Sequence, residues 1–318
     1  MYMNVHFILS GETLESISQE IHLENPEYLK EFHNAHCARQ DIIYNELIAG
    51  KKLLLPDVRT VNKYNSRNDA PFKAPALNPE IPFNPEHFSR IFSVSVFETE
   101  ENGLEKKSNS LTYTASLRWI RKEGNFHIFH LFKNNFSDQQ GSMMSDLASE
   151  SIRALNPFVI KTDEKGEIIT IGLNEKAAQG FGRIKDRLLD LFPDQYARIY
   201  LDEFEFAVTN KDLFDKRMKE DVFMKIYFAP LRNHFKNGKS LLYQSVGEEN
   251  TRVEIVQKVE SQNIPEEIIF QQREMSQQEV VFNGIYTVWI ETGLVKKAEI
   301  SYVISREDIK SYTSVMIQ

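Results

Sequence analysis

The sequence predicts an α+β protein: a small β-α-α-β module followed by a larger, mostly antiparallel β-rich domain with two or three helices. The chain has 318 residues, more than one hydrophobic core usually holds. Six of its eleven prolines lie between Pro56 and Pro85, where they disfavour helix and sheet. Beyond them, apolar and polar residues alternate in runs that are typical of strands. The predicted divisions are a module at 1–57, a proline-rich linker at 58–86 and an α+β domain at 87–318.

The composition is that of an ordinary soluble globular protein, with 41% apolar and 26% charged residues. A net charge of −8 disfavours nonspecific binding to nucleic acid and to anionic membranes. Cys37 is the only cysteine, so an internal disulfide is impossible, which fits a reducing compartment. No apolar run is long enough to insert into a membrane, and the first residues lack the pattern of a signal peptide. We therefore expect a cytoplasmic protein, or one exported by a route that needs no signal peptide.

The small module begins with a strand, a tight turn and a helix. Residues 5–9 form a short apolar run, and Gly11 permits the backbone angles of a tight turn. Thr13 is a residue type that favours the N-cap of the helix that follows. The apolar face of this helix comprises Leu14, Ile17 and Ile21, which recur at helical spacing.

A second helix and a second strand complete the small module. Asn25 is a favoured N-cap residue, and Pro26 occupies the first helical position. Leu29 and Phe32 form the apolar stripe of this helix. The last strand begins after Gly50 and ends at Pro56.

The larger domain is expected to consist mainly of strands. Alternation predicts them at 90–100, 109–122, 125–132, 221–231, 239–246, 251–261 and 266–275, with a closing pair within 284–304. Residues 158–172 predict a hairpin that folds at the sequence DEKG. A helix is predicted within 139–155, and the helical region 173–216 is expected to form two helices because Pro193 interrupts it.

Two of the predicted hairpins resemble each other. VIKTDEKGEIITI and VWIETGLVKKAEI each contain a strand, an acidic turn with a glycine (Gly166 and Gly293) and a second strand. Such a pair fits a duplicated sheet, but antiparallel β proteins also produce similar hairpins by chance.

Residues 5–56 resemble a LysM domain, a short β-α-α-β module best known for binding glycans that contain N-acetylglucosamine, such as peptidoglycan and chitin. The first strand and turn read VHFILSGETL, with Glu12 at the position of the aspartate in the family's GDTL pattern. The other matching positions are Ile17, Ile21, Leu29, Asn34, Gly50, Leu53, Leu55 and Pro56. The resemblance covers about a sixth of the chain.

The resemblance implies a glycan-binding groove between the turn at Gly11–Leu14 and the loop before the last strand. The residues that it assigns to glycan or partner binding are Gly11, Glu12, Thr13, Leu14, Asp41, Ile42 and Ile43. The segment 35–49 is several residues longer than the usual connection in the family. This insertion rebuilds one wall of the implied groove, so protein docking is an alternative to glycan binding.

No metal site, cofactor site or catalytic site is predicted. His33 and His36 have the spacing of a metal pair on a helix, but no further ligands lie nearby except Cys37, so they are interpreted as polar residues at a helix end. The sequence contains neither a phosphate-binding P-loop nor a GxSxG nucleophile motif. Glu203 and Glu205 are a carboxylate pair of a kind that is common on solvated faces.

We therefore expect a non-catalytic protein that binds a peptidoglycan-like glycan, or docks on a protein, through the LysM-like module, with the large domain as an interaction scaffold. The alternative is a cytoplasmic structural or accessory component of a contractile injection apparatus, similar to a type VI system or a phage baseplate. A cell-wall hydrolase is a weaker alternative. The expected partners are glycan or the proteins of an assembly, without nucleic acid and without membrane insertion.

Overall fold

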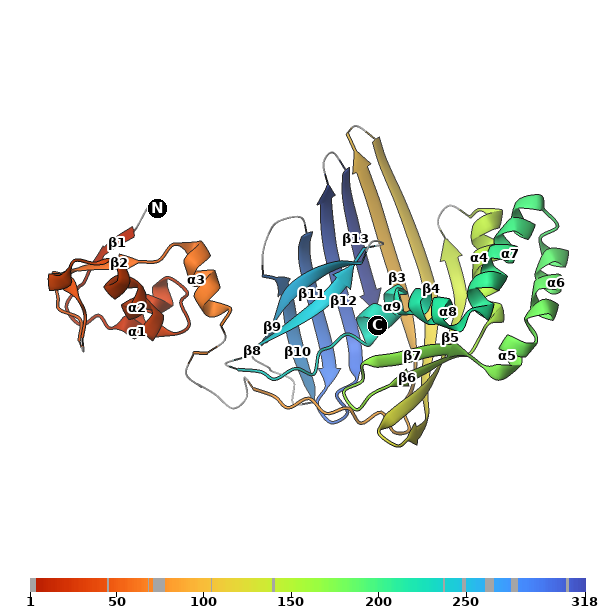
Figure 1. The fold of residues 1–318 in the computed structure, drawn as a ribbon, viewed down its shortest axis with the longest axis horizontal. Helices are drawn as coiled ribbons and strands as arrows, with labels where there is room; N and C mark the ends of the chain where they lie inside the picture. Colours follow the sequence, from red (N-terminus) through yellow and green to blue (C-terminus); the bar gives the residue numbers. More distant parts are fainter. Residues whose placement is uncertain are drawn as a thin grey trace. The chain divides into compact units, whose positions relative to one another are not determined.

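A computed structural model gives the fold of residues 4–44, 46–67, 69–70, 78–103, 105–138, 141–236, 238–247, 250–260, 266–275, 280–306 and 309–318, without the side chain of Lys176. The chain divides into two units (Figure 1). The N-terminal unit comprises Met1–Pro79 with His234–Ser240, and the larger unit comprises Glu80–Asn233 with Leu241–Gln318. None of the described helices is both long enough and apolar enough to cross a membrane.

The N-terminal unit contains a two-stranded antiparallel sheet and short helices. Its elements are β1 (Asn4–Phe7), α1 (Leu14–Glu20), α2 (Pro26–His36), the 3-10 turn η1 (Arg39–Asp41), β2 (Lys52–Leu55) and α3 (Val58–Asn65). Both predicted helix starts are confirmed. The Thr13 side chain accepts a hydrogen bond from the Ser16 amide, and the Asn25 side chain accepts one from the Glu27 amide.

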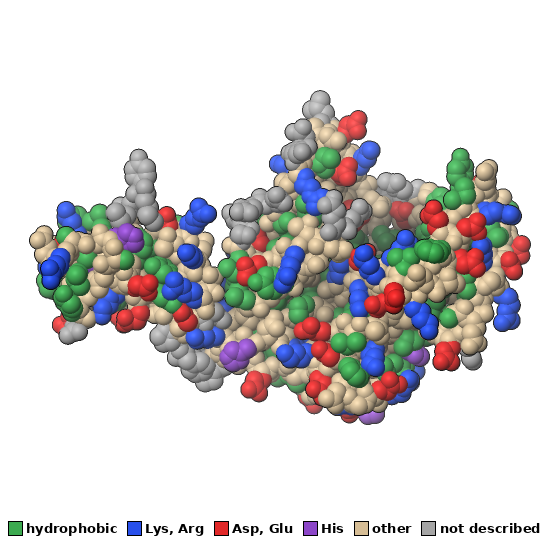
Figure 2. Space-filling view, viewed as in Figure 1, with side chains coloured by type: hydrophobic (Ala, Val, Ile, Leu, Met, Phe, Trp, Pro, Cys, Tyr) green, Lys and Arg blue, Asp and Glu red, His purple; other side chains and the backbone are tan. Residues whose placement is uncertain are grey.

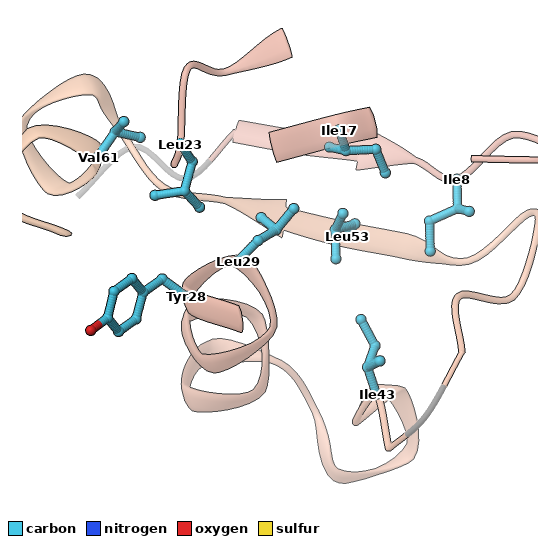
Figure 3. Packing of buried hydrophobic residues seen from close by; sticks show 8 residues of the cluster. All are labelled: Ile8, Ile17, Leu23, Tyr28, Leu29, Ile43, Leu53 and Val61. Atoms are coloured by element: carbon cyan, nitrogen blue, oxygen red, sulfur yellow. The ribbon is translucent and has the colours of Figure 1, made fainter. Parts of the chain in front are cut away.

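The core of this unit lies between β2 and the helices, as Figure 3 shows for eight of its side chains. Ile17, Leu29 and Leu53 are at most 1% exposed, so the predicted apolar positions of both helices and the last strand form one cluster. Ile8, Leu23, Tyr28, Ile43 and Val61 complete it. A core of this size is small, so each of these side chains contributes a large share of the stability.

The expectation that the segment 58–86 holds no helix is wrong at its start, where α3 forms. The Asp57 side chain caps this helix by accepting a hydrogen bond from the Thr60 amide. Pro56 precedes the helix and therefore removes none of its hydrogen bonds. Tyr64 on α3 stacks on Tyr28 with ring centroids 4.6 Å apart, which fixes the helix to the core. Residues 68 and 71–77 of this segment lie outside the described residues.

One 11-stranded sheet organises the larger unit, in the order β7-β6-β5-β4-β3-β13-β12-β11-β10-β9-β8. From β7 to β9 along this order, neighbouring strands are antiparallel. The strands are β3 (Ser89–Asn102), β4 (Glu105–Glu123), β5 (Phe126–Asp138), β6 (Phe158–Thr162), β7 (Ile168–Leu173), β8 (Lys239–Val246), β9 (Thr251–Val259), β10 (Glu267–Glu274), β11 (Val280–Trp289), β12 (Val295–Arg306) and β13 (Ile309–Ile317). The hairpin predicted within 158–172 is confirmed as β6 and β7.

The predicted fold class is wrong. Instead of a small module plus an α+β domain with two or three helices, the chain is dominated by one large, mostly antiparallel sheet with several helices. The prediction omitted β13, the strand that pairs with both β3 and β12. This strand joins the two halves of the sheet into a single layer.

The helices of the larger unit are α4 (Met143–Ala154), α5 (Glu175–Gln179), α6 (Phe181–Leu191), α7 (Gln195–Thr209), α8 (Lys211–Lys219) and α9 (Val222–Tyr227). The region predicted to hold two helices contains four, because Gly180 and Asn210 also end or begin helices. The strand predicted at 221–231 is wrong. The Asp221 side chain accepts hydrogen bonds from the amides of Phe223 and Met224, and this cap starts α9 instead.

Helix α9 packs against β12 and β13 on the face of the sheet that carries the main core (Figure 1). On that face Phe92 of β3 lies 5.1 Å from the ring of Tyr227 and 6.0 Å from that of Phe223. All three side chains are at most 3% exposed. Helix α9 is therefore fixed to the sheet by buried aromatic contacts.

Arg232 holds two distant turns of this sheet together. Its guanidinium group donates to the carbonyl oxygens of Lys165 at 2.9 Å, Gly293 at 2.5 Å and Pro82 at 3.1 Å. It also stacks on Phe83, 4.4 Å from the ring centroid. Lys165 lies in the β6–β7 turn and Gly293 in the β11–β12 turn, although four strands separate β6 from β12 in the sheet. Arg232 therefore fixes the curvature of the sheet.

We call Arg232 and the three carbonyl oxygens that it binds the Arg232 clasp. The two glycines of the similar hairpins, Gly166 and Gly293, both lie at this clasp. A Cβ atom on Gly293 would lie 1.7 Å from the Pro82 carbonyl oxygen, and one on Gly166 would lie 2.7 Å from the Phe83 ring. Both residues also have positive φ angles, +68° and +82°. In both hairpins the backbone of the turn lies so close to Pro82 or Phe83 that only glycine fits.

Replacing Gly293 with alanine is expected to lower the free energy of unfolding by roughly 3 kcal/mol, because the added methyl group collides with backbone. Gly124→Ala is the matched control, since Gly124 has a φ of +60° but open space around its Cβ position. The control should cost only the backbone strain, about 1–2 kcal/mol. Chemical denaturation of both variants measures the difference, and equal losses would contradict the close approach.

Candidate functional site

A cavity of about 550 Å³ lies between α9 and the sheet of the larger unit. Strands β3, β4, β8, β11, β12 and β13 contribute to its wall. The apolar part of the lining comprises Val222, Ile226, Val246, Phe282, Ile300, Ile304, Ile309 and Val315. The charged part comprises Glu98, Glu100, Lys107, Glu220, Lys225 and Arg306. A cavity of this size, with an apolar wall and some polar groups, has the character of a small-molecule site.

At Gly247, which lines the cavity, the backbone packs closely against β12. A Cβ atom there would lie 2.6 Å from Cδ1 of Ile304, so the backbone after β8 packs directly against the β12 side chain. Gly284 on β11 makes the same kind of approach to Ile300. The side chains of Ile304 and Ile300 therefore leave no room for a Cβ atom at either glycine.

A second hollow of about 360 Å³ adjoins the first. The two hollows share Glu220, Lys225, Gln244 and Ser245. The other charged residues of the second hollow are Lys216 and Lys219, so three lysines face one glutamate there. By contrast, Figure 2 shows basic and acidic side chains interspersed over the visible face of the larger unit.

Lys225 lies at the junction of the two hollows. Its ammonium group donates to Oδ1 of Asn250 at 2.6 Å and to the Gly247 carbonyl oxygen at 3.5 Å. Among the described residues, no carboxylate forms an ion pair with it within 4.0 Å. Burial lowers the pKa of Lys225, and the charges of Glu220 and Asp221 only partly offset this effect. Glu220 instead accepts a hydrogen bond from Asn250.

Gln244 faces the same junction. The residue is 7% exposed, and no described residue donates a hydrogen bond to its buried Oε1 atom. The Gln244 side chain forms a hydrogen bond with Tyr286, and a ligand that donates to its free Oε1 atom would remove the cost of a buried acceptor without a partner.

The ion pair of Asp221 and Lys133 positions α9 over the cavity. Lys133 on β5 is 4% exposed, and its ammonium group lies 2.5 Å from Oδ2 of Asp221. The same ammonium group lies 4.8 Å from the centre of the Tyr113 ring. Asp221 therefore caps α9 with one oxygen and binds the sheet with the other. The sequence prediction missed Lys133, Asp221, Lys225 and Gln244, and only the capping pattern after Asp221 could have indicated one of them.

Of the residues predicted from the LysM resemblance, Gly11–Leu14 form the turn between β1 and α1. Gly11 has a φ of +89°. The Glu12 carboxylate accepts hydrogen bonds from the Leu9 amide at 2.7 Å and from Nε2 of His6 at 2.8 Å. Both hydrogen bonds lower the pKa of Glu12, and the bond from the Leu9 amide has the larger effect. Thr13 caps α1, and Leu14 packs against the core. The structure uses these side chains to build the turn.

Asp41, Ile42 and Ile43 lie in the loop after α2, which two helix side chains hold in place. Asn34 accepts from the Ile43 amide at 2.9 Å and donates to the Ile43 carbonyl oxygen at 2.8 Å. Nε2 of His33 donates to the Asp41 carbonyl oxygen at 2.8 Å. Nδ1 of the same ring accepts from the Leu54 amide at 3.0 Å. His33 was interpreted as a polar residue at a helix end, but it is 1% exposed and both ring nitrogens bind backbone.

Lys51 joins the two predicted segments. Its carbonyl oxygen accepts from the Ile8 amide at 3.0 Å, and its ammonium group donates to the Gln40 carbonyl oxygen at 3.1 Å. The turn that follows Ile8 and the loop that contains Asp41 therefore flank the same residue.

Removing the Asn34 side chain as Asn34→Ala is expected to release the loop around Ile43. The loss of two hydrogen bonds to one backbone residue should lower the free energy of unfolding by about 1–3 kcal/mol. Hydrogen exchange at the Ile43 amide should accelerate together with this loss. The control is Asn62→Ala on the exposed face of α3, which should change neither quantity measurably. Unchanged exchange at Ile43 would contradict the pinning role of Asn34.

No protein-family model matches the sequence, and no curated protein matches it. The structure has distant likenesses among solved structures. A structure described as lipid–protein interactions in lipovitellin shares 10% identity over 72% of this chain, with a TM-score of 0.37. A putative outer membrane lipoprotein-sorting protein domain from Vibrio parahaemolyticus shares 7% identity over 72% of this chain and 85% of its own, with a TM-score of 0.20.

A third likeness is a DUF1329 family protein from Desulfovibrio piger, with 10% identity over 72% of this chain and 84% of its own and a TM-score of 0.17. The chain spans a quarter of the length of the lipovitellin chain. All three TM-scores are low, so these likenesses assign neither a family nor a function to this protein. They leave the LysM resemblance of residues 5–56 as a prediction.

Proposed function

We propose that the larger unit binds an elongated amphiphilic molecule in the cavity between α9 and the sheet. The observation that carries this proposal is the cavity itself, about 550 Å³, which is lined by apolar side chains together with charged groups. Burying an apolar chain against such a wall supplies the main favourable free energy, roughly 25 cal/mol for each Å² removed from water. The polar groups would orient the molecule.

The apolar wall of the cavity supports ligand binding rather than a scaffold without a ligand. A binding role also fits the sequence prediction that the protein is not an enzyme, which remains a prediction.

Filling the cavity tests the proposal. Ser311 on β13 lines the cavity, so Ser311→Trp should lower the affinity for the neutral apolar dye N-phenyl-1-naphthylamine by at least roughly tenfold. Ser314→Trp is the matched control, because Ser314 lies on the opposite face of the same strand and is exposed. Fluorescence titration measures both affinities. If the two variants bind the dye equally, or the unaltered protein does not bind it, the proposal is wrong.

A second proposed role belongs to the N-terminal unit: attachment to a peptidoglycan-type glycan or docking on an assembly protein. The observation in its favour is that the turn at Gly11–Leu14 and the loop around Asp41–Ile43 are both held rigidly and flank Lys51. A rigid pair of loops loses little entropy on binding.

Co-sedimentation with purified peptidoglycan tests this second role. The expected result is that the full chain sediments with the polymer and that Ile42→Asp lowers the bound fraction several-fold. Lys63→Asp on the exposed face of α3 is the control. Absence of sedimentation would reject glycan binding. Recovery of sheath or baseplate proteins by affinity purification would then support docking, and recovery of the protein alone would reject both forms of this role.

A further inference from the structure

We infer that the ligand of the cavity is a single-chain amphiphile with an anionic head group, which binds at Lys225 where the two hollows meet. This inference rests on the proposed function of the larger unit and specifies the class of its ligand. The apolar chain would occupy the larger hollow, and the head group would point toward the smaller one.

The distribution of charge around the junction favours an anion. Of the charged residues that line the larger hollow, three are acidic and three are basic: Glu98, Glu100, Glu220, Lys107, Lys225 and Arg306. The smaller hollow has Lys216, Lys219 and Lys225 against Glu220 alone. Asp215 pairs with Lys219, so Lys216 and Lys225 against Glu220 leave one positive charge in excess at the smaller hollow, which a head group placed there would meet.

The bonding of Lys225 also favours an anion. Its ammonium group has three hydrogen atoms, and the described residues accept only two hydrogen bonds from it, both through uncharged oxygens. Half-burying a cation among neutral groups disfavours the charged state, which the lowered pKa of Lys225 reflects. An anionic oxygen of a ligand would supply both the missing acceptor and the missing charge, and hydrogen bonds between charged groups are the strong ones.

Gln244 is the independent observation that points to a ligand at this place. Its Oε1 atom is buried and without a donor among the described residues, and its side chain lines both hollows. A head group that carries a hydroxyl hydrogen, such as a phosphate monoester, would satisfy this acceptor beside the Lys225 ammonium group. Lys219 is a weaker candidate for binding the head group, because its ammonium group already forms an ion pair with Asp215.

The test compares ligands that share one chain and differ only in the head group. Dodecanoate, dodecyl phosphate, dodecanol and dodecyltrimethylammonium would each displace N-phenyl-1-naphthylamine from the full-length protein. The expected result is that both anions bind at least roughly tenfold more tightly than dodecanol, and that the cation binds most weakly. Inorganic phosphate alone should not displace the dye, since it lacks the chain.

Lys225→Met keeps the length of the side chain and removes its charge. This variant should lose the preference for the anions while still binding dodecanol like the unaltered protein. Lys211→Met is the control, because Lys211 lies on the exposed face of α8 and lines neither hollow. Equal binding of dodecanol and the anions, or a preference that survives Lys225→Met, would overturn the inference. If no dodecyl compound displaces the dye, the proposed function itself fails, which is a different result.

Discussion

The curvature of the large sheet depends on one buried cation. Arg232 donates hydrogen bonds to carbonyl oxygens of the β6–β7 turn, the β11–β12 turn and the segment before β3. Burial lowers the pKa of this guanidinium group to about 10, so it stays charged at neutral pH. The charges of Tyr227, Asp163 and Glu167 act against this effect of burial, and the Phe83 ring stacks on the group. A flat sheet could not bring the two turns to one residue. The hydrogen bonds of Arg232 therefore stabilise the curved sheet relative to a flat one.

The cavity follows from this curvature together with the placement of α9. The sheet bends around a helix of only six residues, which covers the centre of its inner face but not its full height. Asp221 begins this helix and, through Lys133, holds it to β5. Beside α9, side chains of the sheet line the cavity instead of packing against another element. Lys225 extends from the helix into this cavity. The same helix thus closes the core and carries the charged group of the proposed site.

Local patterns in the sequence predict local structure well here. The caps at Thr13 and Asn25 and the hairpin within 158–172 follow from residue types and spacing, because neighbouring residues determine them. The single sheet could not be predicted in this way, because β13 joins strands that are far apart in the sequence. α9 was mistaken for a strand because VFMKIYFAPL is apolar throughout and shows no period. Lys225 and Gln244 become a site only through tertiary packing, so no local motif marks them.

Arg232 holds the sheet in its curved form, and this curvature creates the cavity that is proposed to bind the ligand. The most direct measurement is the dissociation constant of N-phenyl-1-naphthylamine for Arg232→Met, compared with that for Arg187→Met on the exposed face of α6. Circular dichroism would first establish that both variants are folded. Arg232→Met should bind the dye at least roughly tenfold more weakly, although no residue that lines the cavity has changed. Equal dissociation constants for the two folded variants would contradict it.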